Sequence, residues 1–163
     1  FLNGKYPYTL NPGGPNHEEL ASLIGIYEYF DKLYEHHFKK KEKNIRKKIE
    51  KINLLFANHE EQIANPLLEY INNDKDLKLI GKNIINKRNR APTISFTSRS
   101  KTSKEISNHL VNNKIATRND NFYAWRCLEA LNIDTKDGVI RTSIVHYNTM
   151  EEVGKLIHTL RIF

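Results

Sequence analysis

The sequence predicts an α/β or α+β fold in which two long helices precede a small, mostly antiparallel sheet flanked by shorter helices. Three observations support this class. Up to Asn72, apolar residues recur at steps of three and four, the period of an amphipathic helix. After Asn72 come short alternating stretches rich in β-branched and aromatic residues, which are typical of strands. Two Thr-x-x-Glu sequences among them are capping boxes that begin helices.

The first helix is predicted from Asn16 to His37, with Asn16 as its N-cap and Glu19 in a capping-box-like position. Its apolar stripe consists of Leu20, Leu23, Ile24, Tyr27, Phe30 and Tyr34. The stretch NPGGPN before it forms a defined loop, because prolines fix the backbone and glycines permit unusual dihedrals. Such a loop either leads the chain into the helix or brings bare amides to a phosphate, and local sequence favours the first.

A second helix is predicted through the lysine-rich run 39–48 to Leu68 or Ile71, with Pro66 kinking or interrupting it near the end. Its apolar stripe continues through the run, at Ile45, Ile49, Ile52 and Phe56. This continuity favours a solvated helix face over a contact with nucleic acid or an acidic surface. No aromatic residues alternate with the lysines, as a groove for single-stranded nucleic acid would require.

The second half is predicted to alternate strands with short helices. Strands are expected at 77–81, 93–98, 114–118 and 138–147, and helices at 102–112, 122–131 and 149–160. The strands should gather in one small sheet, covered on one side by these three helices. The buried sides should carry Ile106, Leu110 and Val111 in the first helix, and Val153, Leu156, Ile157 and Leu160 in the last.

The composition indicates which kinds of binding partner and which cellular compartment to expect. A net charge of +7 means that an acidic partner must be considered. No apolar run is long enough to cross a bilayer, so we expect no membrane partner. One cysteine cannot form an internal disulfide framework, and no signal peptide is recognisable, which favours the cytoplasm.

Cys127 is the obvious candidate nucleophile. Ala124, Leu128 and Leu131 share its helical face, however, which predicts a buried and inert thiol. The seven histidines have no metal-ligand spacing with cysteines or carboxylates, so no metal site is expected. No nucleophile, base and orienting residue together form a convincing triad.

Arg141 lies inside an apolar strand, between Ile140 and Ile144, where a charge needs a partner. One interpretation is a guanidinium that holds a substrate carboxylate at a sheet edge. The other is an ordinary ion pair with an acidic side chain of the protein. The local sequence does not decide between them.

Several stretches in combination resemble a known family. RAPTISFT, NDNFYAWRCLEALNI and GVIRTSIVHYNTMEEV are similar to the C-terminal domain of class V aminotransferase-like proteins, pyridoxal-phosphate enzymes related to cysteine desulfurases and selenocysteine lyases. GGPNHEEL resembles the point where such chains leave the large domain, and ANHEEQIANPLLEYI their long connecting helix. The resemblance implies the C-terminal part of the fold-type-I transferase architecture, with residues 1–72 ending the large domain and 73–163 forming the small one.

The resemblance also implies roles for particular residues. Arg141 matches the arginine that binds the substrate α-carboxylate. Gly13, Gly14, Pro15 and Asn16 match a loop that, in related homodimers, reaches the cofactor phosphate of the neighbouring subunit. Desulfurases usually have threonine at the position of Gly14, so only backbone amides are expected to serve here. The implied partners are an amino-acid substrate, pyridoxal phosphate and a second copy of the chain, without nucleic acid.

The lysine that holds the cofactor normally lies upstream of the GGPN segment, and no lysine here sits in a matching motif. The chain begins with Phe1 and its only methionine is Met150, so we expect the C-terminal portion of a longer enzyme, inactive by itself. The resemblance places the desulfurase cysteine loop near residues 119–123, where Tyr123 occupies what resembles the cysteine position. Transaminase, racemase-like or lyase chemistry therefore fits better than persulfide chemistry.

Two rival functions belong to other classes. The run 39–48 would serve a basic helical module that binds RNA or an acidic protein. Alternatively, the chain is a purely structural dimerisation domain.

Overall fold

The computed structural model describes residues 14–84, 86 and 90–163, and the chain divides into two compact units, Phe1–Leu54 and Leu55–Phe163. Gly13, one of the predicted loop residues, lies outside the described residues. The division falls within a long helix, so each unit is treated separately. The predicted domain boundary after residue 72 concerns the longer protein and stays a prediction.

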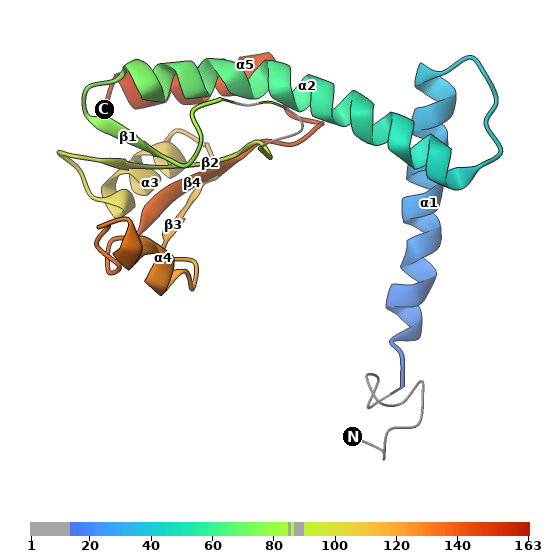
Figure 1. Cartoon of the computed structure of the whole chain (residues 1–163), viewed down its shortest axis with the longest axis horizontal. Coiled ribbons are helices and arrows are strands. Elements are labelled where there is room, and N and C mark those ends of the chain that lie inside the picture. The colour runs from blue at the N-terminus through green and yellow to red at the C-terminus, as the bar shows by residue number, and fades with distance from the viewer. Residues whose placement is uncertain (1–13, 85, 87–89) are drawn as a thin grey trace. The chain divides into compact units, whose positions relative to one another are not determined.

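Five helices and four strands make up the part of the chain that the structure describes (Figure 1). In chain order they are α1 (His17–His37), α2 (Ile45–Asn73), β1 (Leu77–Ile80), β2 (Thr93–Ser98), α3 (Ser103–Asn112), β3 (Arg118–Asp120), α4 (Trp125–Ala130), β4 (Val139–Ser143) and α5 (Met150–Arg161). The mixed α/β class with two long helices first is confirmed.

The predicted helix caps are present. The Asn16 side chain accepts a hydrogen bond from the Glu19 amide at 3.0 Å. Reciprocal capping boxes open α3, through Thr102 and Glu105, and α5, through Thr149 and Glu152. Each box satisfies backbone N–H groups that have no partner within the helix, which fixes the first residue of the helix.

The four strands form one sheet in the order β1-β2-β4-β3, and all three pairings are antiparallel. The predicted small antiparallel sheet is therefore confirmed. The strand predicted at 114–118 is wrong except for its last residue, because the preceding residues complete the end of α3. Lys114 adopts a left-handed backbone with φ of 60°, and the Ile115 amide bonds back to the Leu110 carbonyl.

The core lies on one face of this sheet, where the C-terminal half of α2 lies with α3 and α5 (Figure 1). Its fully buried members include Leu67, Ile94, Phe96, Leu110 and Ile140. The three predicted covering helices included α4, which contributes no residue to this cluster, whereas α2 contributes several. The prediction for α4 is therefore wrong, because this helix has only six residues and buries only Leu128.

Other boundaries also differ from the sequence prediction. Helix α2 continues through Pro66 to Asn73. Val111 is exposed, because it lies one residue beyond Leu110 and so points about 100° away around the helix. β4 ends at Ser143, shorter than the predicted strand, although Ile144 just after it is still buried.

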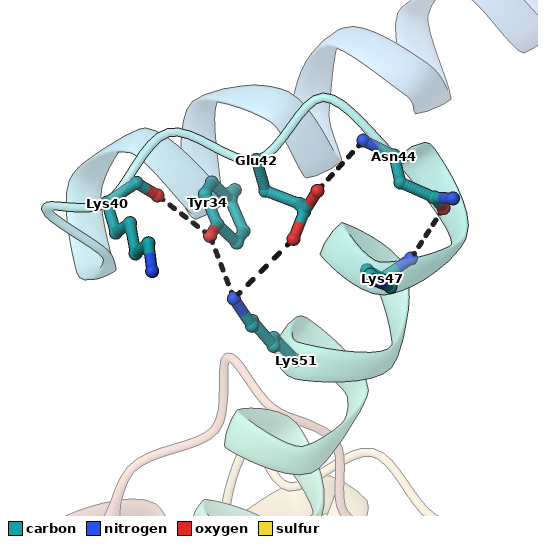
Figure 2. A network of polar contacts seen from close by, with 6 residues as sticks. All are labelled: Tyr34, Lys40, Glu42, Asn44, Lys47 and Lys51. Atoms are coloured by element: carbon teal, nitrogen blue, oxygen red, sulfur yellow. Dashed lines mark hydrogen bonds and ion pairs between the residues drawn. The ribbon is translucent and has the colours of Figure 1, made fainter.

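In the first unit, Tyr34 organises the turn between α1 and α2 (Figure 2). The buried Tyr34 hydroxyl donates to the Lys40 carbonyl at 2.9 Å and accepts from Lys51 Nζ at 3.2 Å. Asn44 caps α2 by accepting from the Lys47 amide at 3.2 Å. The lysine-rich run is thus a loop up to Asn44 and helical only from Ile45, which corrects the prediction of a continuous helix.

The predicted apolar stripe of α1 is largely uncovered within its own unit. Leu20, Leu23 and Ile24 are each at least half exposed. Together with Ile45 and Ile49 of α2, Leu23 lines an apolar groove of about 200 Å³. A face of this kind is a surface on which another protein segment can pack.

Candidate functional site

Arg141 lies on the face of the sheet opposite the helix-covered core. Side chains alternate along β4, and Ile140 and Thr142 are buried on the core face. Arg141 is half-buried and points to the other face, level with Ser95 of β2 and Arg118 of β3. Because β4 pairs on both sides, the prediction of a position at a sheet edge is wrong.

The Arg141 guanidinium has no acidic partner in the described part of the chain: the ion pairs found there are Arg46–Glu50, Lys48–Asp31 and Lys51–Glu42. It stacks instead on the Phe122 ring, with its central carbon 4.3 Å from the ring centroid. A stacked guanidinium keeps its N–H groups free at the rim to bind a carboxylate. This arrangement favours the anion-binding interpretation over the internal ion pair.

Phe122 is positioned by a strained loop between β3 and α4. Phe122 and Tyr123 both adopt left-handed backbone conformations, with φ of 52° and 60°. Asn121 stabilises the loop, because its side chain accepts from the Tyr123 amide at 3.0 Å and donates to the Thr135 carbonyl at 3.2 Å. Two such residues in succession cost free energy, and backbone strain of this kind gathers at functional sites.

The helix predicted from Phe122 to Leu131 is wrong at its start, whereas the resemblance correctly placed a loop near residues 119–123. Helix α4 begins only at Trp125. Left-handed backbone favours glycine and asparagine, so two aromatic residues give no sequence signal for it. Tyr123, at the position compared with the desulfurase cysteine, is 96% exposed.

Cys127 is exposed, so its predicted burial in the core is wrong. The short helix α4 turns only Leu128 inward. Within the described residues no group of three or more histidine, cysteine or acidic side chains could hold a metal ion. None of the helices described is both long and apolar enough to cross a bilayer.

The space beside Gly14 in the loop before α1 is open, since a Cβ built there would meet nothing within 4 Å. Pro15 has no amide hydrogen, and the Asn16 side-chain oxygen is used by the helix cap. The remaining donors of the described loop are its backbone amides and the Asn16 side-chain nitrogen. A phosphate here would be bound through these donors only, and Glu18 and Glu19 in the first turn of α1 would oppose it.

A separate pocket of about 330 Å³ opens between the end of β4 and α5. Thr117, Thr142, Asn148, Glu152 and Leu156 are among the residues that line it. The Thr117 hydroxyl is buried there without a hydrogen-bond partner. Arg141 does not line this pocket, because it points to the opposite face from its neighbour Thr142.

The sequence profile of the aminotransferase class-V family matches residues 5–156. The chain belongs to this family. The aminotransferase-like protein FGM3 of Gibberella zeae is 31% identical over 107 residues, which are 65% of this chain and 27% of that relative. The family is dependent on pyridoxal phosphate, and its members include aminotransferases and cysteine desulfurases.

Solved structures share the fold. The cysteine desulfurase CsdA of Escherichia coli aligns over 96% of this chain with a TM-score of 0.67 and 16% identity. A cysteine desulfurase of Thermococcus onnurineus aligns over 72% with a TM-score of 0.61 and 22% identity. The chain spans about a third or less of each of these structures, 32% and 28%. The pyridoxal-phosphate-dependent transferase fold is therefore confirmed.

Proposed function

We propose that this chain is the C-terminal part of a pyridoxal-phosphate-dependent enzyme that acts on an amino acid, and that Arg141 binds the substrate α-carboxylate. The observation that carries the proposal is the half-buried Arg141 guanidinium, stacked on Phe122 without an acidic partner in the described residues. A guanidinium offers paired donors that match both carboxylate oxygens. When bound, pyridoxal phosphate supplies an electron sink for charge at the substrate α-carbon.

The chain's own residues would bind and orient the substrate. Phe122 packs against the Arg141 guanidinium and restricts its position, and the pairing of β4 on both sides fixes the backbone of Arg141. Orienting one end of an amino acid in this way lowers the entropy cost of reaching the reactive geometry. Tyr123, in place of a cysteine, supports transamination, racemisation or lyase chemistry over persulfide transfer.

We also propose that the chain functions in a homodimer, with the loop 13–16 near the partner's cofactor phosphate. The open space beside Gly14 and the backbone amides of this loop support that role. The exposed apolar face of α1 supports a packing role for the first unit, against the rest of the enzyme or a second copy. We expect the 163-residue chain alone to attach no cofactor covalently, since none of its lysines matches the family motif.

The test of the function is Arg141→Lys in the longer enzyme. Lysine keeps the positive charge but lacks the paired N–H donors of the guanidinium, so we expect substrate affinity to fall about tenfold or more. Cofactor absorbance should change little. Arg126→Lys, at an exposed position on α4, is the matched control and should leave affinity unchanged. Lower stability with unaltered affinity in Arg141→Lys would make Arg141 a structural residue and overturn the proposal.

A basic module that binds nucleic acid is the rival proposal. Lys48, at the end of the run, is paired with Asp31, and Lys51, just beyond the run, contacts Tyr34 and Glu42. These contacts reduce the positive charge that this region leaves free for another molecule. Affinity for random nucleic acid that falls steeply with salt would favour this rival.

A further inference from the structure

Two arginines face each other across the open side of the sheet. Arg118 of β3 is directly opposite Arg141 of β4 in the antiparallel pairing. Residues so paired carry their side chains on the same face with Cβ atoms about 5 Å apart. The placement of Arg118 is independently fixed, because its neighbour Asn119 points to the core face and donates to Ser103 Oγ at 3.1 Å.

The guanidinium groups of Arg118 and Arg141 both lie close to the aromatic ring of Phe122. Arg141 lies 4.3 Å and Arg118 5.9 Å from the centroid of Phe122, measured from the central guanidinium carbon. Arg118 is exposed whereas Arg141 is half-buried, so the pair forms an inner and an outer cation on one face. At these distances, both guanidinium groups can contact the same small molecule.

No carboxylate in the described residues neutralises this pair. Asp120 is the nearest acidic residue along β3, and its side chain accepts from the Asn121 amide at 2.7 Å. It forms no ion pair with either arginine. Like charges directly opposite each other in a sheet destabilise it, so a pair without a counter-ion favours binding of an anion.

We propose that Arg118 binds a second anionic group of the substrate, so that the enzyme acts on a dicarboxylic amino acid. This inference rests on the proposed function, in which Arg141 takes the α-carboxylate. The side-chain carboxylate then lies against Arg118, at the solvent-facing end of the site. Arg118 would then determine which substrates bind. A substrate with an uncharged side chain cannot bond to Arg118, and the repulsion between the two arginines remains.

The binding test uses the ¹⁵N-labelled 163-residue chain, with glutarate and butyrate as probes at constant ionic strength. The arginine Nε–Hε signals of Arg118 and Arg141 report the binding. We expect glutarate to bind at least tenfold more tightly than butyrate. Arg118→Gln should remove this preference and leave butyrate affinity within about twofold, since one charged contact is worth roughly a factor of ten or more.

Three further measurements test whether the preference for glutarate depends on Arg118. Arg126→Gln removes an exposed arginine of α4 and should leave the preference intact. Arg118→Gln should also raise the melting temperature in buffer without multivalent anions, because it relieves the like-charge contact. Arg118→Lys keeps the charge without the fork and should retain only part of the preference for glutarate.

The outcomes separate the two proposals. Equal affinities for the two probes, or a preference that survives Arg118→Gln, overturn the dicarboxylate inference and leave the role of Arg141 standing. Butyrate affinity unchanged in Arg141→Gln overturns the role of Arg141. Absence of any shift of either arginine signal, even at tens of millimolar probe, overturns both.

Discussion

The backbone of Gly138 passes directly against that of Asp120. A Cβ built on Gly138 would lie 2.3 Å from the Asp120 carbonyl carbon and oxygen, and 2.7 Å from the Asn121 nitrogen. Gly138 also has φ of 71°, which other residues rarely adopt. This close approach joins the start of β4 to the loop that carries Phe122, so it supports the ring beside which both guanidinium groups lie.

Gly138→Ala should therefore destabilise the protein. The methyl group would meet backbone atoms that cannot move aside, and the left-handed conformation adds strain. We expect a loss of about 2 kcal/mol or more in the free energy of unfolding, measured by chemical denaturation. Gly154→Ala is the matched control, because a Cβ in that part of α5 meets nothing within 4 Å. It should raise stability by about 0.5–1 kcal/mol.

Tyr34→Phe tests the turn of the first unit. The variant keeps the stacking on Phe38, with ring centroids 4.9 Å apart, but loses the bonds to the Lys40 carbonyl and Lys51 Nζ. We expect the turn to lose about 1 kcal/mol of local stability. Faster amide hydrogen exchange in α1 and in the first turns of α2 would measure this loss. Tyr123→Phe, at a residue that is 96% exposed, should leave exchange unchanged.

Glu152 makes the stability of α5 dependent on pH. Hydrogen bonds from the Asn148 side chain at 3.0 Å and the Thr149 amide at 2.9 Å hold the pKa of this carboxyl below its ordinary value of 4.5. The ionised form is favoured in the folded state. Its contribution to stability is therefore complete above pH 4.5 and is lost as the pH falls through the lowered folded pKa.

Glu152→Gln should remove this dependence. Glutamine still accepts both bonds but carries no charge, so the variant should be less stable at neutral pH and approach the native protein in acid. Melting temperatures between about pH 3 and pH 7 measure the difference. Glu151→Gln removes a carboxylate from the same helical turn without a capping contact, and so gives the baseline for loss of charge near the helix N-terminus. Parallel curves for native protein and Glu152→Gln would contradict the prediction.

Local signals predicted much of this fold. The capping boxes at Thr102 and Thr149 placed the starts of α3 and α5 correctly, because cap chemistry depends on residues only three positions apart. The strand 93–98 was predicted with its observed bounds, since its alternation matches one covered face. These features depend on residues only a few positions apart in the chain, so a sequence pattern can predict them.

Features that depend on distant contacts were not predictable in the same way. The loop at Phe122 and Tyr123 is held by Asn121, which bonds to Thr135, and by the close passage of Gly138. Nothing in the local sequence fixes that geometry. Arg141 was recognised as unusual, but its partner Arg118 emerged only from strand register, which links residues more than twenty positions apart. Cys127 was misplaced because α4 begins three residues later than predicted.

The final prediction concerns the buried Thr117 hydroxyl, which has no hydrogen-bond partner. Desolvating a hydroxyl without a new bond costs free energy, whereas valine has the same shape without the polar atom. Thr117→Val should therefore stabilise the folded chain by about 1 kcal/mol, measured by chemical denaturation.

Thr142, which lines the same pocket, provides the matched comparison. Its buried hydroxyl donates to the Ile94 carbonyl at 3.1 Å, so Thr142→Val removes a bond that is made and should destabilise the chain by about 1 kcal/mol. Both substitutions replace a hydroxyl with a methyl group at residues that line the same pocket, and they should change stability with opposite signs. If both lower stability by a similar amount, the Thr117 hydroxyl has a partner in solution, most simply a water molecule in the pocket.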